Sequence, residues 1–176
     1  MKNKVFLAAG RMVHVKAFDN LVEAFKIFAQ ENSDWKLLLV GDGEDLPMIR
    51  DKIKKYGLEQ RIITPGKTDD IKKYFLQSSV LLLPSRWEGM PMIGLEALEM
   101  GCPIIAYDID AMGPIISDGS NGLIVKENQD VNAYAQAMLE IAENQALRDQ
   151  MRQAALQKAN QFSVGKIMSE WEKIFK

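Results

Sequence analysis

The chain has 176 residues, which is enough for one domain with a sizeable hydrophobic core. Its 47% hydrophobic and 26% charged residues are ordinary for a globular protein, and a net charge of −2 without a long basic run gives no footprint of nucleic-acid binding. The single cysteine, Cys102, excludes an internal disulfide, and no apolar run approaches the roughly 20 residues of a membrane-spanning helix.

Apolar, strand-like segments alternate with segments of helical periodicity along most of the chain. The predicted strands are Lys4–Ala9, Lys36–Val40, Ile62–Thr64, Val80–Leu83, Ile104–Tyr107 and Leu123–Val125. The predicted helices between them are Asp19–Gln30, Asp45–Tyr56, Asp69–Gln77 and Met92–Met100. Strands this apolar are buried on both faces, as in a parallel sheet covered by helices. The sequence therefore predicts a Rossmann-like, doubly wound α/β fold of about six parallel strands with helices on both faces.

After the sixth predicted strand the pattern becomes entirely helical, which predicts a helical C-terminal tail. The predicted helices are Val131–Glu143, Ala146–Asn160 and Val164–Phe175. Asp130 and Ser163 precede the first and last of them and are the predicted N-caps. No linker, repeat or low-complexity segment interrupts the chain, so we expect residues 1–176 to form a single domain.

Two cations flank the turn after the first predicted strand. Arg11 and Lys16 lie there, at the edge of the sheet where the carboxyl ends of parallel strands meet and ligands bind. Arginine offers a planar fork to phosphate oxygens, and lysine offers a mobile charge. The spacing alone favours a simpler interpretation, two solvated cations. His14 between them is a candidate general base, although a loop histidine is more often solvated.

Glycines mark the turns after the second and third predicted strands. Gly41 and Gly43 resemble the start of a dinucleotide-binding fingerprint, but Leu46 stands where the third glycine belongs, so we exclude NAD and FAD. The next turn contains Gly66 and Lys67. Both turns belong to the same edge of the predicted sheet as the first loop.

The stretch from residue 83 to residue 107 carries two carboxylates with seven residues between them. Glu88 lies on a loop after the fourth predicted strand, and Glu96 lies in the following helix. Carboxylates accept hydrogen bonds from hydroxyl groups, and a helix start offers free N–H groups to an anion. Taken alone, the pair fits a simpler interpretation better, by roughly two to one, in which Glu88 pairs with Arg86 and Glu96 is solvated.

The residues around the two carboxylates resemble the donor-site segment of retaining glycosyltransferases of family 4, which have two Rossmann-like domains. The pattern of that family is S-x-x-E-G-x-P-x-x-x-L-E-A-x-x-x-G-x-P-V-I-A. The matching residues are Ser85-Arg86-Trp87-Glu88-Gly89-Met90-Pro91, Leu95-Glu96-Ala97 and Gly101-Cys102-Pro103-Ile104-Ile105-Ala106. With this frame, the functional interpretation of Glu88 and Glu96 becomes the favoured one.

The resemblance implies a role for each candidate residue. Arg11 and Lys16 hold the donor diphosphate and stabilise charge on the leaving group, although Ala17 stands where the family often has glycine. Glu88 binds hydroxyls of the donor sugar, and Glu96 binds those of the ribose. Glu88, Arg11 and Lys16 are therefore the predicted catalytic residues. The remaining predicted donor contacts are Gly41 and Gly43 at the nucleotide, Gly66 and Lys67 at the nucleobase, and Gly89, Met90, Pro91 and Met92 at the phosphate or sugar. A tight turn that needs glycine explains Gly41 and Gly43 equally well.

The resemblance runs from Gly10 to the final helix but covers only half of a complete family member. It implies that residues 1–176 are the C-terminal, nucleotide-sugar-binding domain and that the N-terminal acceptor domain is absent. Trp171, Ile174 and Phe175 in the last helix belong to a segment that crosses back toward that domain, so we expect exposed apolar surface there.

The activity implied is retaining transfer of a sugar from a nucleoside diphosphate sugar, UDP- or GDP-linked, to an acceptor hydroxyl in polysaccharide or glycolipid synthesis. The implied partners are the donor, the chain's own N-terminal domain and a glycan or glycolipid acceptor, without nucleic acid. No metal and no other cofactor is expected. We expect a cytoplasmic protein, with the inner face of the membrane as an alternative location for the full-length form, and an isolated domain that binds without turnover.

Two alternatives remain at this stage. Nucleotide-sugar 2-epimerases share the two-domain fold but lack the glutamate frame found here. A non-enzymatic α/β module of the nucleotide-binding or receiver type is the second alternative. A receiver needs a phosphorylatable aspartate after its third strand, where this chain has Thr64 and Pro65.

Overall fold

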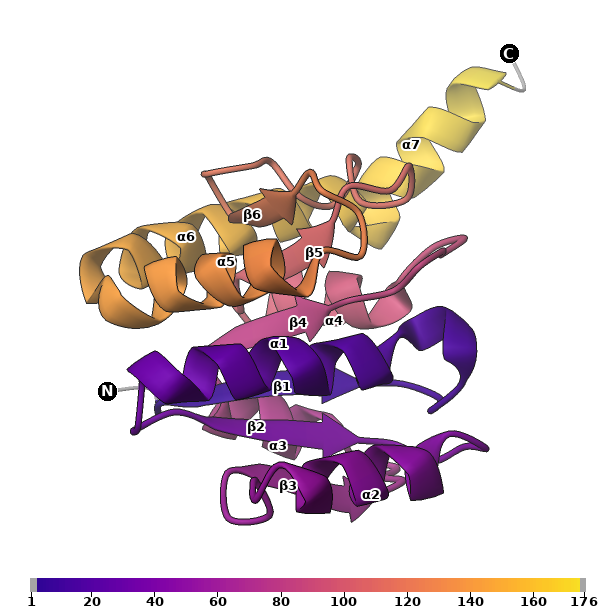
Figure 1. Cartoon of the computed structure of the whole chain (residues 1–176). Coiled ribbons are helices and arrows are strands. Elements are labelled where there is room, and N and C mark those ends of the chain that lie inside the picture. Colours follow the sequence, from indigo (N-terminus) through magenta and orange to yellow (C-terminus); the bar gives the residue numbers. More distant parts are fainter. Residues whose placement is uncertain (1–2, 175–176) are drawn as a thin grey trace.

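The computed structural model describes residues 3–174, apart from the side chain of Glu170. Its centre is a sheet of six parallel strands in the order β3-β2-β1-β4-β5-β6 (Figure 1). The strands are β1 (Val5–Ala9), β2 (Lys36–Val40), β3 (Ile62–Gly66), β4 (Val80–Leu83), β5 (Ile104–Tyr107) and β6 (Gly122–Val125). The predicted Rossmann-like fold is confirmed. A receiver-type module, with strand order 2-1-3-4-5, is excluded.

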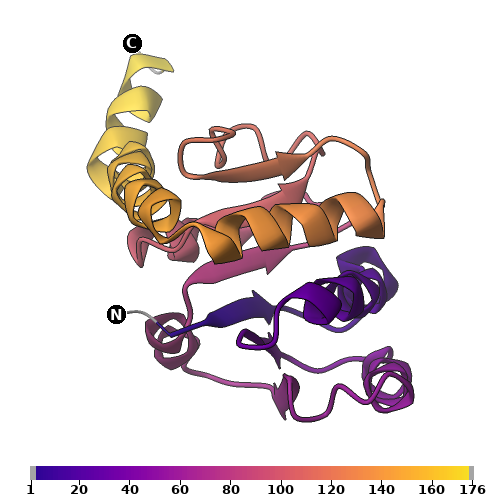
Figure 2. The ribbon, with the colours of Figure 1, turned by 60° about the vertical axis from the view of Figure 1, so that its left-hand side comes forward.

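Helices cover both faces of the sheet (Figure 2). One face carries α1 (Phe18–Glu31), α2 (Leu46–Lys55) and α5 (Val131–Glu143), and the other carries α3 (Lys72–Gln77) and α4 (Met92–Glu99). Alternate residues of a strand point to opposite faces, so Phe6 and Ala8 of β1 enter one core while Leu7 enters the other. Both cores exclude water, which is why the strands are continuous apolar runs.

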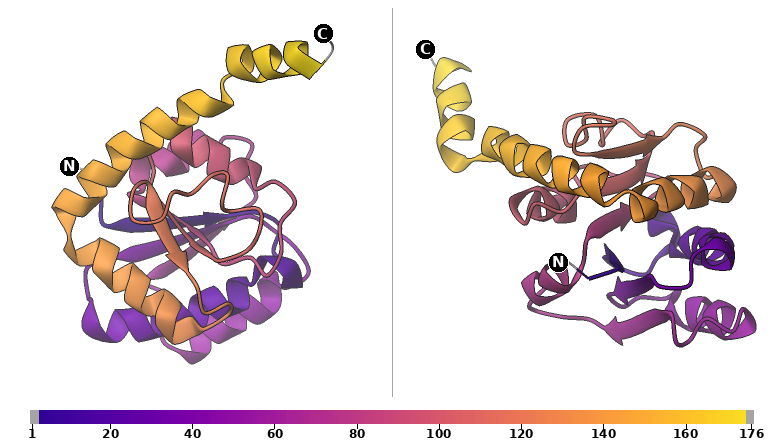
Figure 3. Two further views of the ribbon diagram at one scale, coloured as in Figure 1. Left: turned by 90° about the horizontal axis from the view of Figure 1, so that it is seen from above. Right: turned by 90° about the vertical axis from the view of Figure 1, so that its left-hand side faces the viewer.

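The C-terminal tail consists of helix α6 (Gln145–Ala159), a short 3-10 turn η2 (Asn160–Phe162) and helix α7 (Val164–Ile174). Asp130 caps α5 as predicted, because its side chain accepts bonds from the N–H groups of Asn132 and Ala133. Helix α7 extends away from the rest of the domain (Figure 3). The expected exposed apolar surface is present on it, at Val164, Ile167, Met168, Trp171 and Ile174. Phe175, the predicted end of this helix, lies outside the described residues.

Two local features differ from the prediction. Helix α3 begins at Lys72 rather than Asp69, because the hydroxyl of Thr68 accepts a hydrogen bond from the N–H of Asp70 at 3.1 Å and holds a turn there. The first loop contains an unpredicted 3-10 turn, η1 (His14–Lys16). Ala17 follows it with a left-handed backbone (φ 51°), the conformation for which glycine is the usual choice.

The loops after β1 and β2 are hydrogen-bonded to each other and to the last residues of β2 and β3. Gly10 donates to the carbonyl of Val40 at 3.0 Å, Met12 to Asp42 at 2.8 Å, and Gly41 to Gly66 at 2.9 Å. This close approach needs glycine: a Cβ on Gly41 (φ 144°) would lie 1.9 Å from the carbonyl oxygen of Gly10. The two loops and the end of β3 therefore form one connected surface at the carboxyl edge of the sheet.

Replacement of Gly41 by alanine should lower the free energy of unfolding by more than about 3 kcal/mol, because the new Cβ overlaps a backbone carbonyl and the φ angle suits only glycine. Gly113→Ala is the matched control, since nothing lies within 4 Å of its Cβ position. It should change stability by less than about 0.5 kcal/mol. Urea unfolding of the wild type and both variants measures these changes. If Gly41→Ala were as stable as Gly113→Ala, the loops would be able to move apart without loss of stability.

Candidate functional site

The loops after β1, β2 and β3, together with helix α4, surround a cavity of about 320 Å³ at the carboxyl edge of the sheet. It adjoins the switch point between β1 and β4, where the strand order reverses and where open α/β sheets usually bind ligands. The cavity brings together Arg11, Gly41, Lys67 and Glu96, which the sequence predicted separately. The lining residues are Ala9, Gly10, Arg11, Val40, Gly41, Asp42, Lys67, Thr68, Ile71, Ile93 and Glu96.

Glu96 is the one acidic side chain of α4 that lines this cavity. Its Oε2 atom is buried and has no hydrogen-bond partner among the described residues. Burial, with a smaller contribution from the charge of Glu99, raises the pKa of the Glu96 carboxyl above its ordinary value. A buried carboxylate oxygen without a partner is costly, so it is a good acceptor for a hydroxyl group that enters the cavity. The alternative in which Glu96 is simply solvated is wrong.

Lys16 and Glu88 meet beside this cavity although 72 positions separate them. The Nζ atom of Lys16 lies 2.5 Å from Oε1 of Glu88, and the same oxygen accepts a bond from the hydroxyl of Ser85 at 2.7 Å. The Glu88 side chain is only 9% exposed. The stem of Lys16 passes 3.7 Å from the Cβ position of Gly10, a residue of the cavity wall. A cation and a carboxylate are thus held together at the rim of the cavity.

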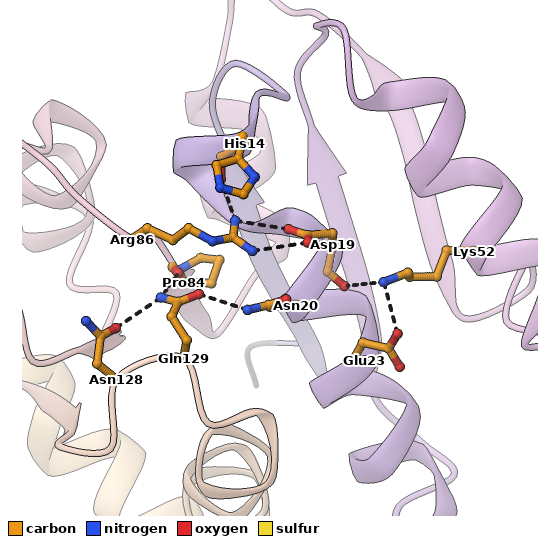
Figure 4. Close-up of polar contacts among 9 residues, drawn as sticks. All are labelled: His14, Asp19, Asn20, Glu23, Lys52, Pro84, Arg86, Asn128 and Gln129. Atoms are coloured by element: carbon orange, nitrogen blue, oxygen red, sulfur yellow. Dashed lines mark hydrogen bonds and ion pairs between the residues drawn. The ribbon is translucent and has the colours of Figure 1, made fainter.

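Arg86 does not pair with Glu88, so the simpler sequence interpretation names the wrong partner. Its guanidinium instead forms two parallel bonds to the carboxylate of Asp19, at 3.2 and 3.1 Å, and also donates to the backbone carbonyl of His14 (Figure 4). The His14 side chain itself is exposed. No sequence spacing indicates the Asp19–Arg86 pair, because the two residues are 67 positions apart.

The remaining predicted contacts lie around the cavity rather than in its wall. Gly43 packs against the backbone of Met12, where a Cβ would lie 2.4 Å from the carbonyl oxygen, so its demand for glycine is explained by the turn. Gly66 ends β3 and accepts the bond from Gly41. In the loop before α4, Gly89 and Met90 are exposed and Pro91 is buried. Met92, the first residue of α4, is exposed.

A larger cavity, of about 620 Å³, lies at the opposite edge of the sheet, but its chemistry is less suited to a ligand. Its Arg148 donates to the carbonyls of Ile141 and Ala142, and its Lys4 pairs with Asp34. Two of its three cations thus already have partners in the fold, and its carboxylate, Asp149, is an exposed side chain. The smaller cavity at the carboxyl edge is therefore the better candidate site.

Within residues 3–174, no helix is both long and apolar enough to span a bilayer. Among the same residues, no three histidine, cysteine, aspartate or glutamate side chains gather closely enough to hold a metal ion.

Comparison with known proteins gives a consistent assignment. The family model described as "Glycosyl transferases group 1" matches residues 1–158. The chain is 34% identical over 175 residues to the amylovoran biosynthesis glycosyltransferase AmsD of Erwinia amylovora, covering 98% of the chain and 48% of that protein. It is 27% identical to an uncharacterized glycosyltransferase of Haemophilus influenzae, covering 99% of the chain and 49% of that protein. The chain thus spans about half the length of these curated relatives.

Solved structures show the same fold. A TarM variant of S. aureus, in complex with fondaparinux, alpha-GlcNAc-glycerol and UDP, matches with a TM-score of 0.92 at 24% identity, over 99% of this chain and 36% of that one. The pneumococcal O-GlcNAc transferase GtfA, in complex with UDP and GlcNAc, matches with a TM-score of 0.88 at 26% identity, over 98% of this chain and 36% of that one.

The raised pKa of Glu96 predicts a specific pH dependence. Because the folded domain holds this proton more tightly than the unfolded chain, the contribution of Glu96 to stability is complete below the ordinary value of 4.5 and is lost as the pH rises through the folded pKa. The wild type should therefore lose stability relative to Glu96→Gln as the pH rises above about 4.5.

Urea unfolding of both proteins at several pH values measures this difference. Glu99→Gln should shrink the loss, because its charge contributes to the shift. A stability difference between wild type and Glu96→Gln that stays constant over this range would show that Glu96 is not desolvated.

Proposed function

The chain belongs to the glycosyl transferases group 1 family, and from this premise we propose that it is the donor-binding half of an enzyme that transfers a sugar from a nucleoside diphosphate sugar to an acceptor hydroxyl. The observation that carries the proposal is the cavity itself. A cation from the β1 loop, a cation from the β3 loop and an unpartnered carboxylate oxygen from α4 all converge on it. A nucleoside diphosphate has the complementary groups, which are anionic phosphates and vicinal ribose hydroxyls.

In this proposal Glu96 accepts hydrogen bonds from the ribose hydroxyls. Glu96 lines the cavity, and the same wall contains Ile71 and Ile93, which suit the apolar faces of the sugar and base. The backbone of Gly66 and the side chain of Lys67 then lie on the side of the nucleobase. The bound UDP of the pneumococcal relative, at 26% identity, supports UDP as the first nucleotide to test.

Arg11 and Lys16 hold the diphosphate from the other end of the cavity. Transfer breaks the bond between the anomeric carbon and the diphosphate oxygen, and the electron pair stays on the diphosphate. The acceptor oxygen forms the new bond with retained configuration and gives up its proton to the departing phosphate. Two cations near the leaving oxygen stabilise the charge that develops there. Glu88 binds hydroxyls of the donor sugar, and backbone groups from Gly89 to Met92 add contacts.

The acceptor site belongs, in this proposal, to an N-terminal domain of a longer protein. The chain spans 48% and 49% of its curated relatives, which leaves room for such a domain. Donor and acceptor must be held together for efficient transfer, because orientation supplies much of the barrier reduction. The chain alone should therefore bind the donor without turnover. We propose an acceptor from polysaccharide or glycolipid synthesis, which fits the name of the relative AmsD. The proposed location is the cytoplasm or the inner face of the membrane.

Epimerisation of a nucleotide sugar is the alternative function with the same donor chemistry. The family match and the relatives named as glycosyltransferases favour transfer. Formation of the 2-epimer from a UDP-sugar, followed by NMR, would support the alternative instead.

Glu96→Gln should weaken binding of UDP or GDP, whichever binds the wild type, by about 1–3 kcal/mol, since it removes a charge-assisted acceptor. Isothermal titration calorimetry measures this affinity. Glu99→Gln, an exposed carboxylate on the same helix, is the matched control and should bind as the wild type does. Unchanged affinity in Glu96→Gln would remove Glu96 from the site. Efficient transfer to simple sugar acceptors by this chain alone would contradict the half-site assignment.

Arg11→Ala and Lys16→Ala should each weaken binding of the nucleoside diphosphate more than binding of the bare nucleoside, because only the former carries the phosphates. The difference should shrink at high salt, which screens exposed charges. Lys54→Ala, an exposed cation on α2, serves as the control for general charge effects. Equal losses with both ligands would indicate that Arg11 and Lys16 act by shaping the loop.

A further inference from the structure

Arg86 joins the two loops that carry Lys16 and Glu88. Its side chain forms the paired bonds to Asp19 at the start of α1 and donates to the carbonyl of His14. Its backbone N–H donates to the carbonyl of Val15 at 2.9 Å. These four hydrogen bonds fix the chain on both sides of Lys16. Arg86 itself is two residues from Glu88.

A second set of polar contacts, through Gln129, also links the start of α1 to the end of β4 (Figure 4). The side chain of Gln129 accepts a bond from the amide of Asn20 at 2.8 Å and donates to the carbonyl of Pro84 at 3.4 Å. Gln129 has a left-handed backbone (φ 63°), which is uncommon for a residue with a side chain. The start of α1 is thus tied to the end of β4 both through Arg86 and through Gln129.

The pairing also determines which cation Glu88 meets. Asp19 accepts bonds from both outer nitrogens of the Arg86 guanidinium, which directs that group toward α1 rather than toward Glu88. Burial raises the pKa of the Asp19 carboxyl, but the bonds and charge of Arg86, with help from Lys52, outweigh this and hold the pKa below its ordinary value. Asp19 is therefore ionised at neutral pH, and Lys16 is left as the partner of Glu88.

We infer that the Asp19–Arg86 pair is a positioning device that sets Lys16 beside Glu88, so that the diphosphate and the donor sugar are bound by groups in fixed register. This inference rests on the proposed function. Arg86 and Asp19 touch no substrate in it and act only through the two loops. A fork of two parallel bonds suits the role, because it fixes orientation as well as distance, which a lysine cannot do.

The first test compares Asp19→Asn and Arg86→Lys with the wild type in binding of UDP and uridine by calorimetry. Both variants should lose roughly twofold to thirtyfold in UDP affinity, the usual range for residues that act through a neighbour, and little in uridine affinity. Asp34→Asn is the matched control: it removes the exposed Lys4–Asp34 ion pair, which touches neither loop, and should bind both ligands as the wild type does.

A second readout needs no ligand. The coupling energy between Lys16 and Glu88 is measured by urea unfolding of Lys16→Met, Glu88→Gln and the double variant. The cycle is then repeated in the Asp19→Asn background, where the coupling should fall toward zero. A coupling that Asp19→Asn leaves intact would overturn the inference, and so would a UDP affinity that neither Asp19→Asn nor Arg86→Lys changes. If the wild type binds neither UDP nor GDP, the proposed function fails while the coupling result still decides the positioning role.

Discussion

The approach of three loops over the carboxyl ends of β1, β2 and β3 is the constraint on which the site depends. Gly41 lies so close to the carbonyl of Gly10 that no side chain can be accommodated, and its N–H donates to the carbonyl of Gly66, the last residue of β3. The hydrogen bonds of the sheet therefore continue beyond its strands. Because the first two loops and the end of β3 are bonded to one another, Arg11 and Lys67 are carried on a single connected surface at the cavity.

The charged side chains near this surface differ in how fully they are paired. Arg86 and Asp19 satisfy each other through two bonds, and Lys16 and Glu88 satisfy each other at the rim. Glu96, which lines the cavity, keeps a buried oxygen that has no hydrogen-bond partner within the described part of the chain. Folded proteins usually pair such groups, and unpaired ones concentrate where a ligand supplies the missing contact. The presence of this oxygen on a residue that lines the same cavity as Arg11 and Lys67 is the physical basis for proposing that the cavity binds a nucleoside diphosphate.

The sequence predicted the architecture well because burial on both faces leaves an unmistakable apolar pattern in each strand. Spacing alone favoured solvated side chains at Arg11 and Glu96, and the resemblance to the glycosyltransferase pattern is what indicated a site for both residues. The sequence could not predict that Lys16 pairs with Glu88 and Arg86 with Asp19, because these pairs join positions 72 and 67 residues apart. Both pairs depend on the contact between the loop after β1 and the loop after β4, which the sequence does not reveal. The start of α3 was missed because one hydroxyl, that of Thr68, favours a turn over another helical residue.

Chemical-shift mapping by NMR tests the central claim most directly. With uniformly labelled protein, addition of UDP should shift the backbone amides of Gly10–Lys16, the loop after β3 and the first turns of α4, all of which surround the 320 Å³ cavity. Amides along α6 at the opposite edge should remain unchanged. Shifts centred on α6 and the 620 Å³ cavity instead would contradict the account, because they would place the nucleotide at the opposite edge of the sheet, away from Glu96 and Arg11.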